Sequence, residues 1–215
     1  MAVVISLQKT YQEQADALQR VNDCAGALAK YDLVIEILDR ILKFEPGHAR
    51  AFEDRHFAAI ERAEILTTLS RLDDAFAEWD KALKYSPTMF VELVHMNRTR
   101  TVAWTGKHRQ ATEQADAILE RQPSGTKLNR HLLLASALTF AVAAQVALRE
   151  DEDEHDNAES KAQSELYAKR SVELLGSYKN AGGSTTNVLD NRDLQFLAVR
   201  SDFQALKEST GPQAK

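Results

Sequence analysis

The stretch RAEILTTLSRLDDAFAEWDKALKYSP, residues 62–87, decides the fold. Its alanines Ala63, Ala75 and Ala82 stand at spacings typical of two antiparallel helices that pack through small side chains. Pro87 cannot continue a helix and predicts the end of the second one. The stretch therefore predicts a helical hairpin of the kind from which repeat proteins are built.

The composition of the whole chain also favours helices. Its 215 residues are 44% hydrophobic and 27% charged, which is ordinary for a soluble globular protein. The chain has only eight glycines and four prolines, so long segments run without the turn residues that an all-β chain needs. We therefore expect an all-α fold.

Apolar residues recur every three or four positions in a series of segments along the chain. Short polar or glycine-containing stretches separate these segments, and we expect turns at 22–23, 70–73 and 105–107. The expected helices cover residues 6–22, 25–44, 48–69, 89–104, 127–149 and 161–178. Two further helices are expected to follow the turns at 70–73 and 105–107, one returning through Trp79 to Tyr85 and one through Ala111, Ala115 and Ile118 to Gln122.

Three of these segments close on similar sequences, LKFEP at 42–46, LKYSP at 83–87 and LERQP at 119–123. Their prolines are 41 and 36 residues apart, close to the repeat length of about 34 residues in tetratricopeptide repeats. Residues 15–123 resemble three such repeats, and a fourth helix pair follows them. The resemblance implies a right-handed solenoid of about four helix pairs over residues 1–178, with a concave groove that holds a peptide or protein segment.

The segment 179–208 has a different character and is expected to cap the repeats. Its pattern Asp-x-x-Leu…Leu…Arg-x-x-Asp-Phe-x-x-Leu resembles the tail of tetratricopeptide regions in planctomycete-type bacterial serine/threonine protein kinases. We expect two short helices here, the second capped by Ser201 with Gln204 three residues later. Residues 209–215 are expected to form a disordered tail. The apolar residues that would cover the last helix pair are Leu194, Phe196, Leu197, Phe203 and Leu206.

The acidic stretch EDEDEHDNAE at 150–159 marks the connection inside the fourth pair. A calcium loop needs a glycine at its bend and a glutamate at its close, where this chain has Asp156 and Ala162. We therefore expect a solvated loop over about 150–160 rather than a metal site.

Nothing in the sequence indicates catalysis or a cofactor. The chain has no glycine-rich phosphate loop, no kinase catalytic motif and no histidine pair with the spacing of metal ligands. We therefore expect a noncatalytic protein that needs no metal.

Charge, cysteine content and hydropathy indicate the compartment and the class of partner. The net charge of −5 argues against nonspecific binding to nucleic acid. Cys24 is the single cysteine, and the N-terminal sequence does not read as a signal peptide, so we expect a cytoplasmic location. The apolar run 132–148 includes polar residues and is short for a membrane span, so we expect a buried helix there and no membrane partner.

The most informative polar residues lie on the expected helix 89–104 and at the start of the next first helix. Asn97 and Arg100 belong to the former, and Asn129 and Arg130 to the latter. We interpret these four as a basic, amide-bearing strip in the groove that holds an acidic or C-terminal carboxylate ligand. The sequence does not identify the partner, and a homodimer stays open.

Two other functions stay open. The chain could be a regulatory or substrate-positioning tail of a bacterial serine/threonine kinase, or derived from one, and a kinase domain encoded upstream in frame would favour this reading. It could also be an enzyme that depends on a metal or nucleotide, which would then raise its unfolding temperature.

Overall fold

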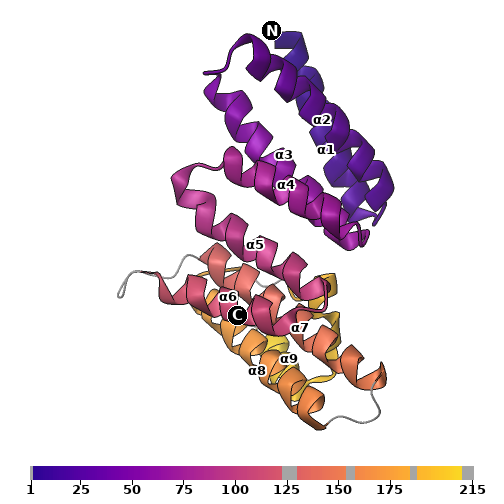
Figure 1. Ribbon diagram of the computed structural model, residues 1–215, viewed down its shortest axis with the longest axis vertical. Coiled ribbons are helices and arrows are strands. Elements are labelled where there is room, and N and C mark those ends of the chain that lie inside the picture. Colours follow the sequence, from indigo (N-terminus) through magenta and orange to yellow (C-terminus); the bar gives the residue numbers. More distant parts are fainter. Residues whose placement is uncertain (1, 123–129, 154–157, 185–187, 210–215) are drawn as a thin grey trace, which may run out of the picture. The chain divides into compact units, whose positions relative to one another are not determined.

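The computed structural model describes residues 2–122, 130–153, 158–184 and 188–209, which form helices joined by turns, with no strand among them (Figure 1). The prediction of an all-α fold is confirmed. The chain divides into two compact units, Met1–Val94 and His95–Lys215. The α-helices are α1 Ala2–Arg20, α2 Cys24–Phe44, α3 Ala49–Thr68, α4 Leu72–Lys84, α5 Val91–Trp104, α6 His108–Glu120, α7 Arg130–Asp153, α8 Ala158–Asn180 and α9 Ser201–Glu208, with 3-10 segments η1 Thr88–Phe90 and η2 Arg192–Val199.

In the first unit each helix packs on the next, α1 on α2, α2 on α3 and α3 on α4. The predicted hairpin of residues 62–87 is present as α3 and α4, and Ala63, Ala75 and Ala82 are fully buried. Trp79 packs with Ala63 and Ala82 in one apolar cluster. Small side chains on α3 and α4 therefore let the two backbones approach closely and leave room for the indole.

Left-handed residues close the turns after α1, α3 and α5. Asn22, Ser70 and Gly106 have φ values of 61°, 58° and 87°. After α1 and α3 the backbone also makes matching hydrogen bonds, from the N–H of Asp23 to Leu18 O and from the N–H of Arg71 to Leu66 O, each at 2.9 Å. These are Schellman-type endings, which satisfy the last carbonyls of a helix and reverse the chain. The turns predicted at 22–23 and 105–107 are confirmed, whereas the turn predicted at 70–73 is shorter, because α4 already begins at Leu72.

In the second unit α7 packs against α6, α8 and η2. Serine hydroxyls of α8 donate to backbone carbonyls of α7, Ser164 to Ala144 O at 2.8 Å and Ser171 to Ala137 O at 2.7 Å. The predicted buried helix is confirmed: the stretch Arg130–Arg149 is long and apolar enough to cross a membrane, but 78% of its most apolar window is buried inside the protein.

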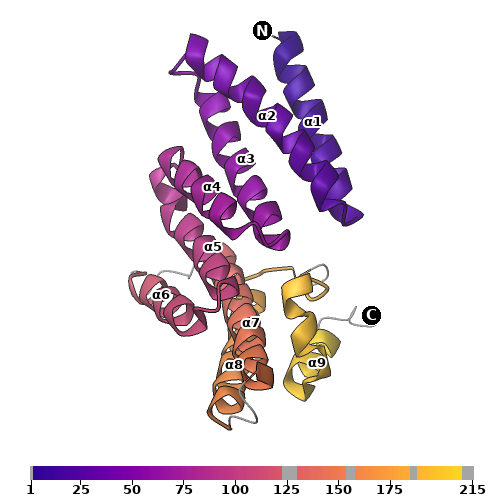
Figure 2. The ribbon, with the colours of Figure 1, turned by 45° about the vertical axis from the view of Figure 1, so that its right-hand side comes forward.

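The C-terminal segment covers α7 and α8 through η2 and α9 (Figure 2). Leu194, Leu197 and Phe203 are buried, as expected of capping residues, while Phe196 and Leu206 are half-buried. The prediction that Ser201 caps the second short helix is wrong. Ser201 is the first residue of α9, and Arg200 occupies the N-cap without a side-chain cap bond. Gln204 donates instead to Ala198 O.

Arg200 explains why the cap differs from the sequence pattern. Its guanidinium binds the carboxylates of Asp202 and Glu165, and the hydrogen bonds to Asp202 hold the pKa of that carboxyl below its usual range. Asp202 in turn accepts a hydrogen bond from the N–H of Phe203 at 2.8 Å. The start of α9 is thus stabilised by an aspartate inside its first turn rather than by Ser201.

The acidic stretch is more helical than predicted. Helix α7 continues through Asp153 and α8 begins at Ala158, so part of the expected loop belongs to two helices. The remainder, 154–157, lies outside the described residues, as do Pro123 and the tail 210–215.

Candidate functional site

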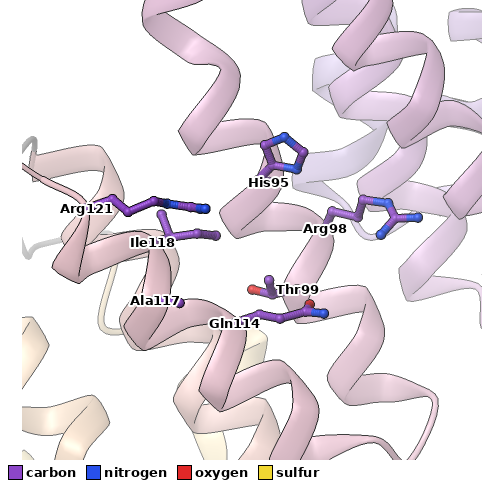
Figure 3. Close-up of a pocket in the computed structure, with 7 residues that line it drawn as sticks. All are labelled: His95, Arg98, Thr99, Gln114, Ala117, Ile118 and Arg121. Atoms are coloured by element: carbon purple, nitrogen blue, oxygen red, sulfur yellow. The ribbon is translucent and has the colours of Figure 1, made fainter.

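An open cleft of about 270 Å³ lies between α5 and α6 in the second unit (Figure 3). We call it the α5–α6 cleft. Helix α5 and helix α6 contribute three residues each, and the seventh is Arg121, the C-cap residue of α6. The lining residues are His95, Arg98, Thr99, Gln114, Ala117, Ile118 and Arg121.

Hydrogen bonds inside the unit fix the α5 side of the cleft. The Thr99 hydroxyl is buried and donates to Met96 O at 2.6 Å, and it lies 3.4 Å from the hydroxyl of Thr139 on α7. Thr99 lines the cleft together with His95 and Arg98, which precede it on α5 by four positions and one position. The hydroxyl of Thr99 is thus engaged inside the unit, although the residue also lines the cleft.

Gln114, Ala117 and Ile118 lie on α6 within four positions of one another, and Arg121, the C-cap residue, follows Ile118 by three positions. Ile118 is 3% exposed and forms the apolar part of the cleft. Arg121 is exposed, and in Figure 3 its side chain extends from α6 towards α5. The cleft therefore combines an apolar floor with a polar, positively charged edge.

The electrostatics of the α5–α6 cleft favour anions. Three lining residues are basic or can become so, namely His95, Arg98 and Arg121, and none of the lining residues in this described part of the chain is acidic. Within the described residues, the side chains of His95 and Gln114 make no hydrogen bond. Guanidinium and amide groups together suit a carboxylate, because both donate N–H bonds to its oxygens.

The structure describes three of the four predicted site residues, and these three are not all accessible. Arg100 is 8% exposed, and its Nε lies 3.6 Å from a carboxylate oxygen of Asp193 in η2. Its prediction as a groove residue needs correction, because its guanidinium is directed into the protein. Asn97 is half-buried, Arg130 is exposed at the start of α7, and Asn129 lies outside the described residues.

The sequence pattern predicts Arg100 as a site residue, whereas the arginine of α5 that lines the cleft is Arg98. Arg98 and Arg100 are two positions apart, which places them on opposite sides of a helix. The helical period alone does not say which side is packed, since polar residues occur all around 91–104. In the sequence Arg121 belongs to the ending LERQP. Its spacing from Gln114 and Ile118 places it in line with both, at the C-terminal end of α6.

Among the described residues, no group of three or more His, Cys, Asp or Glu side chains could hold a metal ion. No protein-family model, curated protein or solved structure matches the chain. The resemblance to tetratricopeptide repeats therefore stays a prediction from the sequence.

Proposed function

We propose that this protein is a noncatalytic interaction module that binds an acidic segment of another polypeptide in the α5–α6 cleft. The observation that carries the proposal is the composition of the cleft, because Arg98, Arg121 and His95 line it together with Gln114 and none of its described lining residues is acidic. A carboxylate placed there would gain charge-assisted hydrogen bonds. Ile118 would pack against the apolar part of the same segment.

We further propose that the helices form a solenoid similar to tetratricopeptide repeats. The packing of α1 to α4 in succession, and of α6, α7 and α8 in succession, supports this arrangement. The left-handed residues at Asn22, Ser70 and Gly106 support it as well, because each closes the first helix of a pair with the same backbone device. In such arrays the ligand surface is formed by residues on several helices rather than by a single deep pocket.

The test uses synthetic peptides and the full chain. A fluorescein-labelled peptide rich in Asp and Glu, with a free C-terminal carboxylate, is titrated with protein and followed by fluorescence anisotropy. The comparison peptide has the same length and is rich in Lys. We expect saturable binding of the acidic peptide only, weakened about tenfold in Arg98→Gln/Arg121→Gln, the loss expected when charge-assisted hydrogen bonds are removed.

A matched control separates the cleft from the overall charge. The variant Arg20→Gln/Arg40→Gln removes the same formal charge at exposed positions of α1 and α2. We expect it to bind the acidic peptide as the unchanged protein does. Equal weakening in both double variants, with helicity preserved in circular dichroism, would refute the assignment of the cleft.

A further inference from the structure

A second cleft, in the first unit, lies between α2, α3 and α4 and has a volume of about 340 Å³. We call it the α2–α4 cleft. Its size is at the lower end of the range for small-molecule sites. It contains four basic and three acidic side chains, so it keeps a net positive charge. The lining residues are Asp32, Ile35, Asp39, Arg55, Arg62, Glu78, Lys81, Lys84 and Tyr85.

Arg55 is the most unusual of these residues, because its side chain is only 4% exposed. Its Nε donates to the Asp39 carboxylate at 2.8 Å, and its guanidinium carbon lies 5.2 Å from the centre of the Tyr85 ring. Its Nη1 atom is buried and has no hydrogen-bond partner among the described residues. An unmatched buried donor costs about 1–3 kcal/mol, and more when it is charged, so folded proteins usually supply an acceptor.

Two more donors line the same cleft next to Arg55. Lys84 is exposed, its Nζ lies 5.6 Å from the centre of the Tyr85 ring, and it makes no ion pair within the described part of the chain. The Tyr85 hydroxyl likewise makes no hydrogen bond to a described residue. Arg55 and Lys84 therefore both approach the Tyr85 ring with hydrogen-bonding capacity that the fold does not use.

The other two basic residues are already engaged. Arg62 Nη1 and Lys81 Nζ each lie 2.6 Å from the same oxygen of Glu78. Arg62 also reaches Asp32, with Nε 2.7 Å from the carboxylate. Arg62 and Glu78 lie two helical turns from Arg55 and Tyr85 respectively, about 10 Å along the axes, so this ion-pair group leaves the donors around Tyr85 available.

We propose that the α2–α4 cleft is a binding site for a carboxylate group, held by Arg55, Lys84 and the hydroxyl of Tyr85. The carboxylate would accept from Arg55 Nη1, and the exposed Lys84 would move aside to admit it and then close over it. One negative charge balances the net charge of the cleft, whereas Asp32 and Asp39 would repel a dianion such as phosphate. This site is independent of the α5–α6 cleft and of the function proposed for it.

The probe is sodium acetate, titrated into the full chain at constant ionic strength with sodium chloride as the reference salt. The readout is the ¹⁵N–¹H resonances of the arginine side chains. We expect the Arg55 resonance to shift saturably with a millimolar dissociation constant, as a ligand of so few atoms allows. Sodium phosphate at the same ionic strength is expected to shift it less. A stronger effect of phosphate would overturn the carboxylate assignment in favour of a general oxyanion site.

Variants make the assignment specific. Arg55→Lys keeps the charge but loses the planar fork, and we expect it to weaken acetate binding about tenfold. Lys84→Gln alters an exposed residue, so the variant keeps its fold, and we expect it to weaken binding about threefold. Arg40→Lys, on the exposed side of α2, is expected to change nothing.

Unchanged acetate binding in Lys84→Gln would overturn the proposal, and so would an Arg55 resonance that responds to acetate and chloride alike. The second result would mean that water alone satisfies Arg55 Nη1. Neither result bears on peptide binding at Arg98 and Arg121, which the anisotropy experiment tests separately.

Discussion

Arg100 of α5 and Asp193 of η2 form an ion pair across the second unit, with 3.6 Å between Nε and Oδ2 and with side chains that are 10% and 18% exposed. The pair links two segments that lie far apart in the sequence. Helix α7 packs against η2 next to this pair.

We expect Arg100→Glu to lower the free energy of unfolding by about 3 kcal/mol, because it sets two carboxylates against each other in a poorly solvated place. Urea unfolding followed by circular dichroism measures this loss. The exchanged variant Arg100→Glu/Asp193→Arg is expected to recover part of it. A loss of peptide binding in Arg100→Glu without a loss of stability would contradict the structural role and support the predicted groove role.

Ala75 gives a test of close helix packing on α4. It is fully buried, whereas Ala77 on the same helix is exposed. We expect Ala75→Leu to destabilise the protein by about 1–3 kcal/mol through overpacking against its neighbours. Ala77→Leu is the matched control and is expected to stay within about 0.5 kcal/mol of the unchanged protein. Equal unfolding midpoints for the two variants would show that the α3–α4 contact is looser than described.

The left-handed turn residues predict opposite effects of glycine and alanine. Ser70 is exposed and has a φ of 58°, which a side chain with a Cβ disfavours. We expect Ser70→Gly to raise the free energy of unfolding by about 0.5–1 kcal/mol. Gly106 has a φ of 87°, and we expect Gly106→Ala to lower the free energy of unfolding by about 1 kcal/mol. Thermal unfolding of both variants checks the pair, and a destabilised Ser70→Gly would argue against the turn.

Burial of His56 predicts a pH dependence of stability. Its ring is fully buried, Nδ1 lies 3.1 Å from Ala82 O, and Nε2 has no partner among the described residues. Burial lowers the pKa of His56 below its ordinary value of 6.5, against the smaller opposing effects of the Ala82 carbonyl and Glu53. His56 therefore binds a proton more readily in the unfolded chain than in the folded one. The contribution of neutral His56 to the free energy of unfolding is complete above pH 6.5 and is lost as the pH falls towards the folded-state pKa.

Urea unfolding at about pH 7.5 and about pH 5.5 measures this contribution. In His56→Gln the amide can still donate to Ala82 O, and we expect a smaller loss of stability on acidification than in the unchanged protein. His131→Gln alters an exposed histidine and should leave the loss unchanged. The account of His56 fails if the two variants respond to pH in the same way.

Binding at the α5–α6 cleft should depend on salt. Arg121 is exposed, so its attraction for an acidic peptide is screened by ions. Raising sodium chloride from about 0.05 M to about 0.5 M shortens the screening length roughly threefold and is expected to weaken binding about tenfold. Anisotropy titrations at several salt concentrations measure the slope, which should be shallower in Arg98→Gln/Arg121→Gln. An affinity independent of salt would point to apolar contacts instead.

The helices could be predicted because local signals agree along the chain. The apolar period, the turn residues at Asn22 and Gly106 and the terminal Pro87 all act within a few positions, and Asp23 accepts from the N–H of Gly26 as a helix cap should. The site could not be predicted in the same way. Whether Arg98 or Arg100 faces solvent depends on Asp193, a partner more than ninety residues away that no periodic pattern reveals. Arg55 could not be predicted as a site residue for the same reason, because its contacts are with Asp39 of α2 and with Tyr85 at the end of α4.

Helix α7 has a consequence for the order of events during synthesis. Its apolar surface is covered from three sides, by α6 before it and by α8 and η2 after it. Local helix pairs can fold while the ribosome is still adding residues, because their partners are adjacent in the chain. The surface of α7 that contacts η2 is covered only after residues 192–199 have been synthesised. In a nascent chain stalled before Asp193, the face of α7 that packs against η2 would therefore stay exposed to water.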